Sequence, residues 1–217
     1  MCKTYTCLLS EQTITFTANG QVEDDTLSPG EFEQLISRRQ RPKLSTTSKI
    51  ANALFKRYAL NDQLLELGGE PTATPLVICN RYANWDYVAD VMSTDIATTL
   101  NGINNYVATA WFPATVQGYL TIEYGNTAEA VTLASRDPDF IAAAVDGLFC
   151  RDDNADRCGT VILATFECIP AHIAGQPLSG LRPAAFGAVS LIGAADSETD
   201  IVMAIATHQE MYSHVRA

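Results

Sequence analysis

The chain has 217 residues, of which 47% are hydrophobic and 18% are charged, and its 14 basic and 25 acidic residues give a net charge of −11 at pH 7. This length suffices to bury a sizeable core, and we expect residues 1–217 to form a single domain. The negative charge argues against a nucleic-acid partner, because phosphate contacts need concentrated Lys and Arg.

The apolar runs are too short for a membrane span. The longest lie at residues 76–79, 161–164 and 184–195, and each is strand-sized or broken by Gly and Ser. We therefore expect no transmembrane helix. The first seven residues lack a basic region followed by a long apolar stretch, so we expect no signal peptide, and the cytoplasm is the default location.

The first third of the chain predicts two strands and two helices. Residues 5–9 and 13–17 read as short strands, and Ser28 is placed to cap a helix that has an acid in its first turn. Residues 47–67 predict one long amphipathic helix, which Gly68-Gly69 would end.

A basic cluster separates these two helices. Its sequence is Arg38-Arg39-Gln40-Arg41-Pro42-Lys43, in a chain that is acidic overall. A run of this kind is usually a solvated loop, but it could also contact an acidic protein.

The middle of the chain alternates between strands and helices. Residues 75–80 predict a buried strand, and residues 86–100 carry apolar side chains at helical spacing. A second helix is expected near residues 114–124, and residues 130–134 read as the next strand.

The last third begins with a capped helix. Asp137 precedes Pro138, which is the arrangement of an N-cap followed by proline at the first helical position, and the helix is predicted at 138–149. A strand is expected at 159–166.

Two further strands, at 185–192 and 201–207, would close the chain as a β-hairpin. The tail 203–217 also has helical spacing, which suggests a surface helix or a helix that docks onto a partner. The overall order is that of an α/β protein.

Cysteine and histidine show no metal pattern. There is no C-x-x-C pair, and the spacing of the histidines completes no ligand set; the residues are Cys2, Cys7, Cys79, Cys150, Cys158, Cys168, His172, His208 and His214. Buried reduced thiols are the simpler interpretation. Cys150 and Cys158 could form a disulfide only in an oxidising compartment. We expect no metal and no cofactor.

Common catalytic signatures are missing from the sequence. It contains no G-x-S-x-G, H-E-x-x-H, G-x-G-x-x-G or P-loop motif, and no spacing gives Ser10, Ser37, Ser45 or Ser190 a base. A hydrolase or decarboxylase that uses Asp137 or Asp139 with a late histidine is therefore a weak alternative.

The segment 112–134, FPATVQGYLTIEYGNTAEAVTLA, resembles the N-terminal half of β-ketoacyl synthases. The family has the same succession of a Phe-Pro pair, a small-residue helix with a glycine, a Leu-Thr-Ile-x-x-Gly turn and a strand. Its strand leads into an elbow that exposes a nucleophilic cysteine. Here that position falls on Asp137, or on Arg136 if the register slips by one residue. Neither side chain can form the thioester that the reaction needs.

The resemblance extends from about residue 38 to residue 192. Cys79-Asn80-Arg81 stands where the family has a small residue, an arginine and a polar turn, and Glu167 and Pro170 match an acid and a proline after a later strand. One departure is a shorter connection between Phe112-Pro113 and Gly118. The implied fold is α/β, a truncated thiolase-like fold with α/β/α layers that is one half of a ketosynthase and lacks the half with the catalytic histidines.

Such a chain most resembles the short chain-length factors of type II polyketide synthases, as in aryl polyene or aromatic polyketide systems. The resemblance implies a non-catalytic subunit that forms a heterodimer with a catalytic ketosynthase, meets an acyl carrier protein through that complex, and shapes the tunnel for the growing chain. The residues expected at the tunnel or interface are Trp111, Phe112, Thr115, Val116 and Tyr119.

Two alternatives stay open at this point. Each of these five side chains could simply pack in the core along one helix face. The whole chain could also be a stand-alone docking or scaffold protein for an acyl carrier protein. An unusually apolar exposed face would favour the subunit over the stand-alone protein.

Overall fold

The computed structural model describes residues 2–82, 84–95, 110, 112–149, 159–171, 180 and 182–215. Its strands are β1 (Lys3–Leu9), β2 (Ile14–Ala18), β3 (Gln21–Val22), β4 (Leu76–Cys79), β5 (Ala130–Leu133), β6 (Thr160–Ile169) and β7 (Ala184–Gly193). Its α-helices are α1 (Pro29–Gln34), α2 (Thr46–Arg57), α3 (Leu60–Glu66), α4 (Trp85–Asp95), α6 (Thr115–Glu123), α7 (Pro138–Phe149) and α9 (Glu198–Glu210). Two 3₁₀ turns are η1 (Arg41–Lys43) and η2 (Met211–His214).

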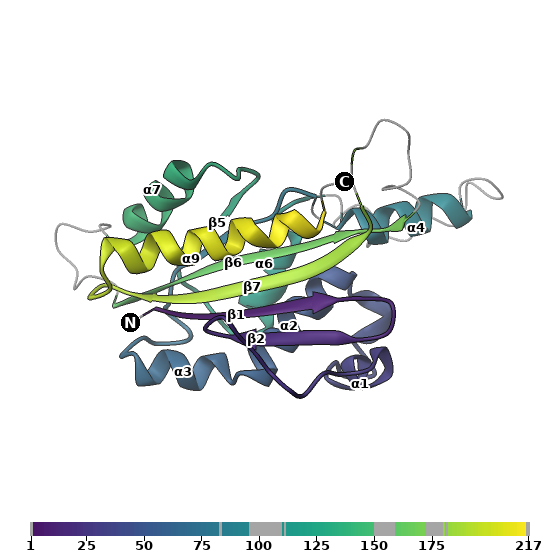
Figure 1. Cartoon of the computed structure of the whole chain (residues 1–217), viewed down its shortest axis with the longest axis horizontal. Coiled ribbons are helices and arrows are strands. Elements are labelled where there is room, and N and C mark those ends of the chain that lie inside the picture. The colour runs from purple at the N-terminus through teal and green to yellow at the C-terminus, as the bar shows by residue number, and fades with distance from the viewer. Residues whose placement is uncertain are drawn as a thin grey trace.

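All the strands belong to one seven-stranded sheet with the order β3-β2-β1-β7-β6-β4-β5. β4 runs parallel to both β5 and β6, whereas β7 is antiparallel to its neighbours β6 and β1. The long strands β6 and β7 form the middle of the sheet (Figure 1). The parallel strands β4, β5 and β6 therefore end at one edge, where loops that carry functional groups commonly lie.

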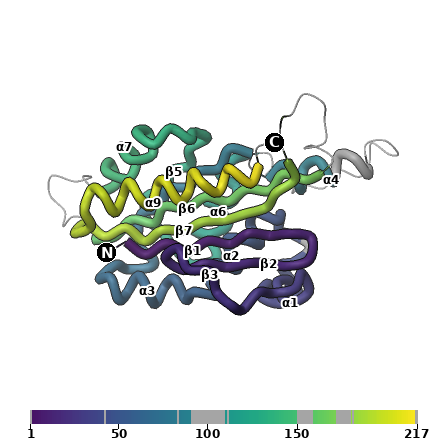
Figure 2. Tube along the Cα trace, in the orientation of Figure 1, coloured from purple at the N-terminus to yellow at the C-terminus, as the bar shows by residue number. Residues whose placement is uncertain are grey.

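Helices cover both faces of this sheet. α7 and α9 lie on one face, and α1, α2 and α3 lie on the other, as the trace in Figure 2 shows. One core cluster packs the strands against α2, α3 and α6, and a second packs them against α7 and α9. The result is the α/β/α layering that the sequence predicts.

Residues of β6 alternate between the two cores. Ile162, Ala164 and Phe166 belong to the cluster on the α2 side, while Val161 and Leu163 belong to the cluster on the α7 side. All ten residues of β6 are buried. This is why the strand reads as one continuous apolar run instead of an alternating pattern.

Gly187 brings α2 close to β7. A side chain at this position would place its Cβ 2.5 Å from Cγ2 of Ile50 and 3.0 Å from Cδ1 of Leu54, both on α2. The missing side chain therefore sets the distance between this helix and the sheet.

The predicted long helix at 47–67 is wrong, because the chain breaks into α2 and α3. Ala59 adopts a left-handed backbone conformation with φ 45°, which no α-helix can continue. Just before the break, the Tyr58 hydroxyl donates to the Thr17 carbonyl oxygen at 3.1 Å, and its ring stacks on Tyr5 with centroids 4.3 Å apart. These contacts tie the end of α2 to the β1–β2 hairpin.

The predicted strand at 201–207, and with it the closing hairpin, is also wrong. Ser197 and Asp200 form a capping box that starts α9. Ala204, Ile205 and His208 then face the sheet at helical spacing, and η2 continues with Met211 and Tyr212 buried. The tail is thus a helix that packs on the sheet by one face and exposes Val202 and Met203 to solvent, as the predicted surface helix would.

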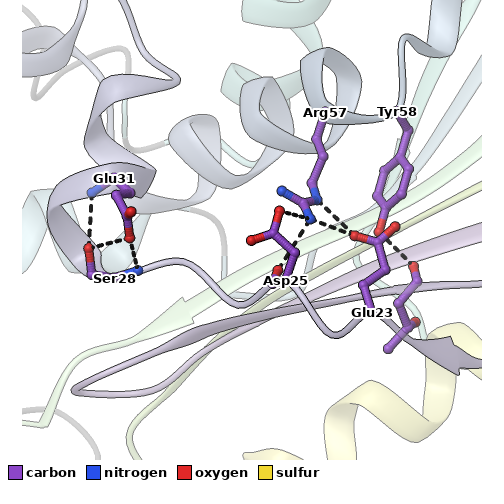
Figure 3. Close-up of polar contacts among 7 residues, drawn as sticks. Glu23, Asp25, Ser28, Glu31, Arg57 and Tyr58 are labelled. Atoms are coloured by element: carbon purple, nitrogen blue, oxygen red, sulfur yellow. Dashed lines mark hydrogen bonds and ion pairs between the residues drawn. The ribbon is translucent and has the colours of Figure 1, made fainter.

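Arg57 at the end of α2 holds the loop between β3 and α1 (Figure 3). Its guanidinium group donates to Glu23 at 2.6 Å and to the Asp25 carboxylate at 3.1 Å. The same group lies 4.4 Å from the centroid of the Phe16 ring. One cation therefore links a helix end, a loop and a core aromatic ring.

Within the part of the chain that the structure describes, no helix is long and apolar enough to cross a membrane. Cys7, Cys79 and Cys168 are buried free thiols, as the sequence predicts for them. Burial raises the pKa of Cys79 to about 12, so its thiol stays protonated at neutral pH. Cys150 and Cys158 lie outside the described residues.

Candidate functional site

A cavity of about 560 Å³ lies beside α6, and we call it the α6 cavity. Its walls come from α6, from the start of α2 and from the start of α4. The lining residues are Lys43, Leu44, Ser45, Ser48, Asn84, Tyr87, Ala110, Phe112, Ala114, Thr115, Gly118, Tyr119 and Ile122. Most of these residues present apolar atoms, and this suits an apolar ligand.

α6 divides its residues between the cavity and the core. Thr115, Tyr119 and Ile122 line the cavity at spacings of four and three residues, which places them on one helix face. Val116 and Leu120 point the other way, into the core beneath. The helix is therefore anchored by one face and exposes the other to the cavity.

The residues singled out from the sequence divide in the same way. Phe112, Thr115 and Tyr119 come together at the α6 cavity, whereas Val116 is fully buried in the core and does not line it. Trp111 lies outside the described residues.

The mouth of the cavity is apolar and open to solvent. Phe112 is 64% exposed and Ile122 is 84% exposed, which is unusual for side chains of this size. Trp85, at the start of α4 next to the lining residue Asn84, is 55% exposed. Three large apolar side chains are thus available at or near this site.

Tyr119 is held in place by Asn52 of α2. The Asn52 side-chain amide nitrogen donates to the Tyr119 hydroxyl, and Asn52 is fully buried. Burial raises the pKa of Tyr119 to about 12, so its hydroxyl stays neutral at physiological pH. Sequence reasoning missed Asn52, since a single polar residue in an apolar helix run carries no recognisable signal.

Asn84 connects the start of α2 to the turn before α4. Its side-chain oxygen accepts hydrogen bonds from Ser45 Oγ at 2.6 Å and from Thr47 Oγ1, and its amide donates to the Ala110 carbonyl oxygen at 3.4 Å. Nearby, the Asp86 carboxylate accepts from the Thr46 backbone N–H at 2.8 Å. This buried network fixes the polar wall of the cavity.

The elbow after β5 holds Arg136 and Asp137. Asp137 Oδ1 accepts from the Asp139 backbone N–H at 3.0 Å, which confirms the predicted capping of α7. The Arg136 guanidinium lies 5.2 Å from the centroid of the Tyr212 ring. The backbone carbonyl oxygen of Arg136 accepts a hydrogen bond from Gln209 Nε2 at 2.7 Å. Both residues thus make ordinary structural contacts.

Glu167 is a buried carboxylate near this elbow. It accepts hydrogen bonds from the Tyr212 hydroxyl at 2.7 Å, from the Tyr82 backbone N–H at 2.9 Å and from the Arg81 backbone N–H. Burial nevertheless raises the pKa of Glu167 to about 7, because removal from water disfavours its charged form. The side chain fastens the turn after β4 to η2.

His208 forms a second buried polar network. Thr165 Oγ1 lies 2.8 Å from His208 Nδ1, Ser190 Oγ lies 3.0 Å from His208 Nε2, and Ser190 in turn lies 2.7 Å from Thr4 Oγ1. The spacing of residues in the sequence pairs no base with Ser190, whereas the fold places the imidazole of His208 beside it. Ser190 is fully buried, so a substrate could not reach this pair. Burial lowers the pKa of His208 to about 3.

In the ranges that the structure describes, no group of three or more His, Cys, Asp or Glu side chains is arranged to hold a metal ion.

No family model matches the chain, and neither does any curated protein. Solved structures do match. One belongs to a complex of a type II polyketide synthase acyl-carrier protein with its ketosynthase bound to the hexaketide; it has a TM-score of 0.58 and 20% identity, over 77% of this chain and 52% of that one. Another is from the ketosynthase ApeO in complex with its chain-length factor ApeC from Xenorhabdus doucetiae; it has a TM-score of 0.56 and 12% identity, over 87% of this chain and 76% of that one.

These likenesses show the fold. The chain has the thiolase-like α/β fold of ketosynthase-type proteins, and it spans about half the length of the first of these two chains. The fold expected from the sequence resemblance is thereby confirmed.

Proposed function

We propose that this chain is a non-catalytic chain-length factor of a type II polyketide synthase. On this proposal it forms a heterodimer with a catalytic ketosynthase, and the α6 cavity borders the tunnel in which the growing chain extends. The proposal also treats residues 1–217 as one ketosynthase-like half-domain.

The α6 cavity is the observation that carries this proposal. Phe112, Thr115 and Tyr119 were singled out from the sequence as residues at the tunnel or the partner interface, and these three side chains line one cavity of about 560 Å³. Its mostly apolar wall suits a growing carbon chain more than a charged metabolite. Tyr119 is the bulkiest side chain on the wall formed by α6, so we assign to it the limit on chain length.

The exposed apolar side chains at the mouth support a protein partner. Phe112 and Ile122 project from the cavity into solvent, and a partner that covered them would bury apolar surface and stabilise the pair. This feature favours a subunit over a stand-alone docking protein. The solved ketosynthase complexes with the same fold add weight to a ketosynthase as the partner.

The elbow residues support a non-catalytic role. The carboxylate of Asp137 caps α7, and Arg136 packs over an aromatic ring. Neither group is a soft nucleophile. We therefore assign the condensation chemistry to the partner ketosynthase.

The test is co-expression with the ketosynthase of the same biosynthetic system, followed by light scattering on the purified material. We expect a stable complex whose mass equals one copy of each chain. The chain expressed alone is the control. A chain that remains separate from the ketosynthase at every concentration tested would refute the proposal.

A further inference from the structure

We propose that a cavity of about 410 Å³ at the elbow after β5 is a binding site for a small organic carboxylate, which Arg136 holds by its charge. We call it the elbow cavity, and its described lining consists of Arg136, Gln209, Tyr212 and Ser213. The residues described for this cavity and for the α6 cavity do not overlap. The inference therefore goes beyond the function proposed above and does not depend on it.

The elbow cavity lies at the edge of the sheet where parallel strands end. β4 ends at Cys79 and β5 ends at Leu133, and these two residues are paired in the sheet. Arg136 follows shortly after β5, so it comes from the carboxyl end of a parallel strand. The rest of the described lining comes from the end of α9 and from η2. In open α/β sheets, ligands commonly bind just outside these strand ends.

Arg136 is held in position before any ligand arrives. Its backbone carbonyl oxygen accepts from Gln209 Nε2, and its guanidinium lies over the Tyr212 ring. That ring is fixed in turn, because its hydroxyl donates to Glu167 at 2.7 Å and it packs edge-on against Phe186 with centroids 5.3 Å apart. The attraction between a guanidinium and an aromatic ring needs no hydrogen bond, so N–H donors of Arg136 remain for a ligand.

The charge of Arg136 lacks a carboxylate partner within the described part of the chain. Lys3, Lys49 and Arg57 each form an ion pair there, whereas Arg136 forms none with the described acidic residues. The described lining of the elbow cavity contains no carboxylate either. The cavity thus combines one cation with neutral polar side chains, and this combination suits an anion.

Carboxylates outside the lining oppose an anion. Asp137 and Glu210, each next to a lining residue in the chain, are exposed, and Glu167 is buried behind Tyr212. Water and salt screen the two exposed charges more than they screen a direct contact between a ligand and Arg136. We therefore expect a weak site, with a dissociation constant on the order of 1 mM.

The geometry of the donors favours a carboxylate over a phosphate. A planar guanidinium matches the two oxygens of a carboxylate, and the Ser213 hydroxyl and Gln209 amide can add donors. A phosphate dianion has more acceptor oxygens to satisfy, and the nearby carboxylates would repel its larger charge more strongly. Because Arg136 stays protonated, the site holds its ligand and forms no covalent bond with it.

The test uses the full chain and two matched probes, butyrate and its uncharged amide, butyramide. Ligand-observed NMR titrations give the dissociation constants, and inorganic phosphate is then added in competition with butyrate. The variants are R136Q, R136K and the control R38Q. This control changes the net charge as R136Q does, at an exposed arginine that does not line the elbow cavity. Thermal melts report whether each variant is folded.

We expect the wild type to bind butyrate at least about fivefold more tightly than butyramide. R136Q should weaken butyrate binding roughly tenfold, R136K should weaken it less, and R38Q should bind like the wild type.

Equal affinities for the two probes would overturn the inference, as would R136Q that binds butyrate like the wild type, or a wild type that binds neither probe. Phosphate that displaces butyrate at equal concentration would overturn the choice of a carboxylate. If R136Q fails to fold, the comparison of butyrate with butyramide and the effect of R136K decide the same question. The result is independent of the proposed function, since no ketosynthase takes part in this experiment.

Discussion

The side-chain amide of Asn52 on α2 donates a hydrogen bond to the hydroxyl of Tyr119 on α6, and this bond fixes an aromatic ring on the wall of the α6 cavity. The donor belongs to a fully buried side chain, and the acceptor lies on a half-buried ring. The position of the ring is therefore set by the fold and not by the ligand.

Substitutions at Tyr119 should change product length according to ring bulk. We expect Tyr119→Ala to give longer products and Tyr119→Trp shorter ones, in assays of the complex with its ketosynthase and mass spectrometry of the products. Tyr119→Phe is the matched control, because it keeps the ring and removes only the hydroxyl. Unchanged length in both Ala and Trp variants would remove Tyr119 from the tunnel.

Asn52→Leu should free the Tyr119 ring. Loss of this partly buried hydrogen bond should cost about 0.5–1.5 kcal/mol of stability, and a mobile ring should broaden the distribution of product lengths. Urea unfolding of Asn52→Leu, Tyr119→Phe and the double variant forms a cycle that isolates the pairwise energy. If the cost of Asn52→Leu were the same in the Tyr119→Phe background, the hydrogen bond would contribute nothing.

Gly118 offers a way to fill the cavity without disturbing the fold. A Cβ at this position would meet no heavy atom within 4 Å, and the residue lies on the cavity wall. Gly118→Leu should shorten the product and raise stability by up to about 0.8 kcal/mol through better helix propensity. Gly147→Leu on α7 is the control, because its Cβ is equally unobstructed but lies away from the cavity. Shorter products from both variants would argue against a cavity effect.

The helix spacing of the site could be read from the sequence, but its three-dimensional surroundings could not. Thr115 and Tyr119 share a helix face because of their spacing, and the sequence shows that directly. Asn52 on α2 and Asn84 in the turn before α4 both make hydrogen bonds at the α6 cavity. No local sequence pattern predicts that these two segments lie together there. Val116 lies next to Thr115 in sequence but faces the core, which a list of neighbouring residues does not reveal.

The two errors in secondary structure have the same origin. Ile201 and Val202 are β-branched and favour a strand locally, yet the capping box of Ser197 and burial against the sheet make this segment a helix. The break at Ala59 likewise follows from contacts of Tyr58 with the distant β1–β2 hairpin. In both places tertiary contacts override the local pattern.

Arg57→Met should destabilise the fold by about 1–3 kcal/mol in urea unfolding. The variant removes the bonds to Glu23 and Asp25 together with the guanidinium group that lies over the Phe16 ring. Asp25→Asn is the control and should be nearly neutral, because the Asp25 side chain is 73% exposed. A neutral Arg57→Met would show that the loop between β3 and α1 is held by its other contacts.

Glu167 and His208 should give opposite dependences of stability on pH. The folded state raises the pKa of Glu167 from 4.5 to about 7, because it favours the protonated side chain. The contribution of Glu167 to the free energy of unfolding is therefore complete below pH 4.5 and is lost as the pH rises to 7. The folded state lowers the pKa of His208 from 6.5 to about 3, so its contribution is full above pH 6.5 and is lost as pH falls towards 3.

The variant Glu167→Gln separates the two contributions. Urea unfolding of the wild type and of this variant at steps from pH 4 to pH 8 gives the difference in stability at each pH. We expect the stability of the wild type relative to the variant to fall as pH rises from about 4.5 to 7, because the wild type alone loses the benefit of the proton. A difference that stays constant across this range would mean that Glu167 keeps an ordinary pKa in the fold.

The position of β7 has a consequence for the way the chain must assemble. β7 lies between β1 and β6, so it joins the hairpin strands at the start of the chain to the parallel strands made later. During synthesis on the ribosome, both groups of strands exist before residues 184–193 emerge, and each waits with an open edge. Because pairing of residues so far apart in sequence is slow, this interval exposes the chain to aggregation, and chaperones that bind unpaired strands should act at that stage.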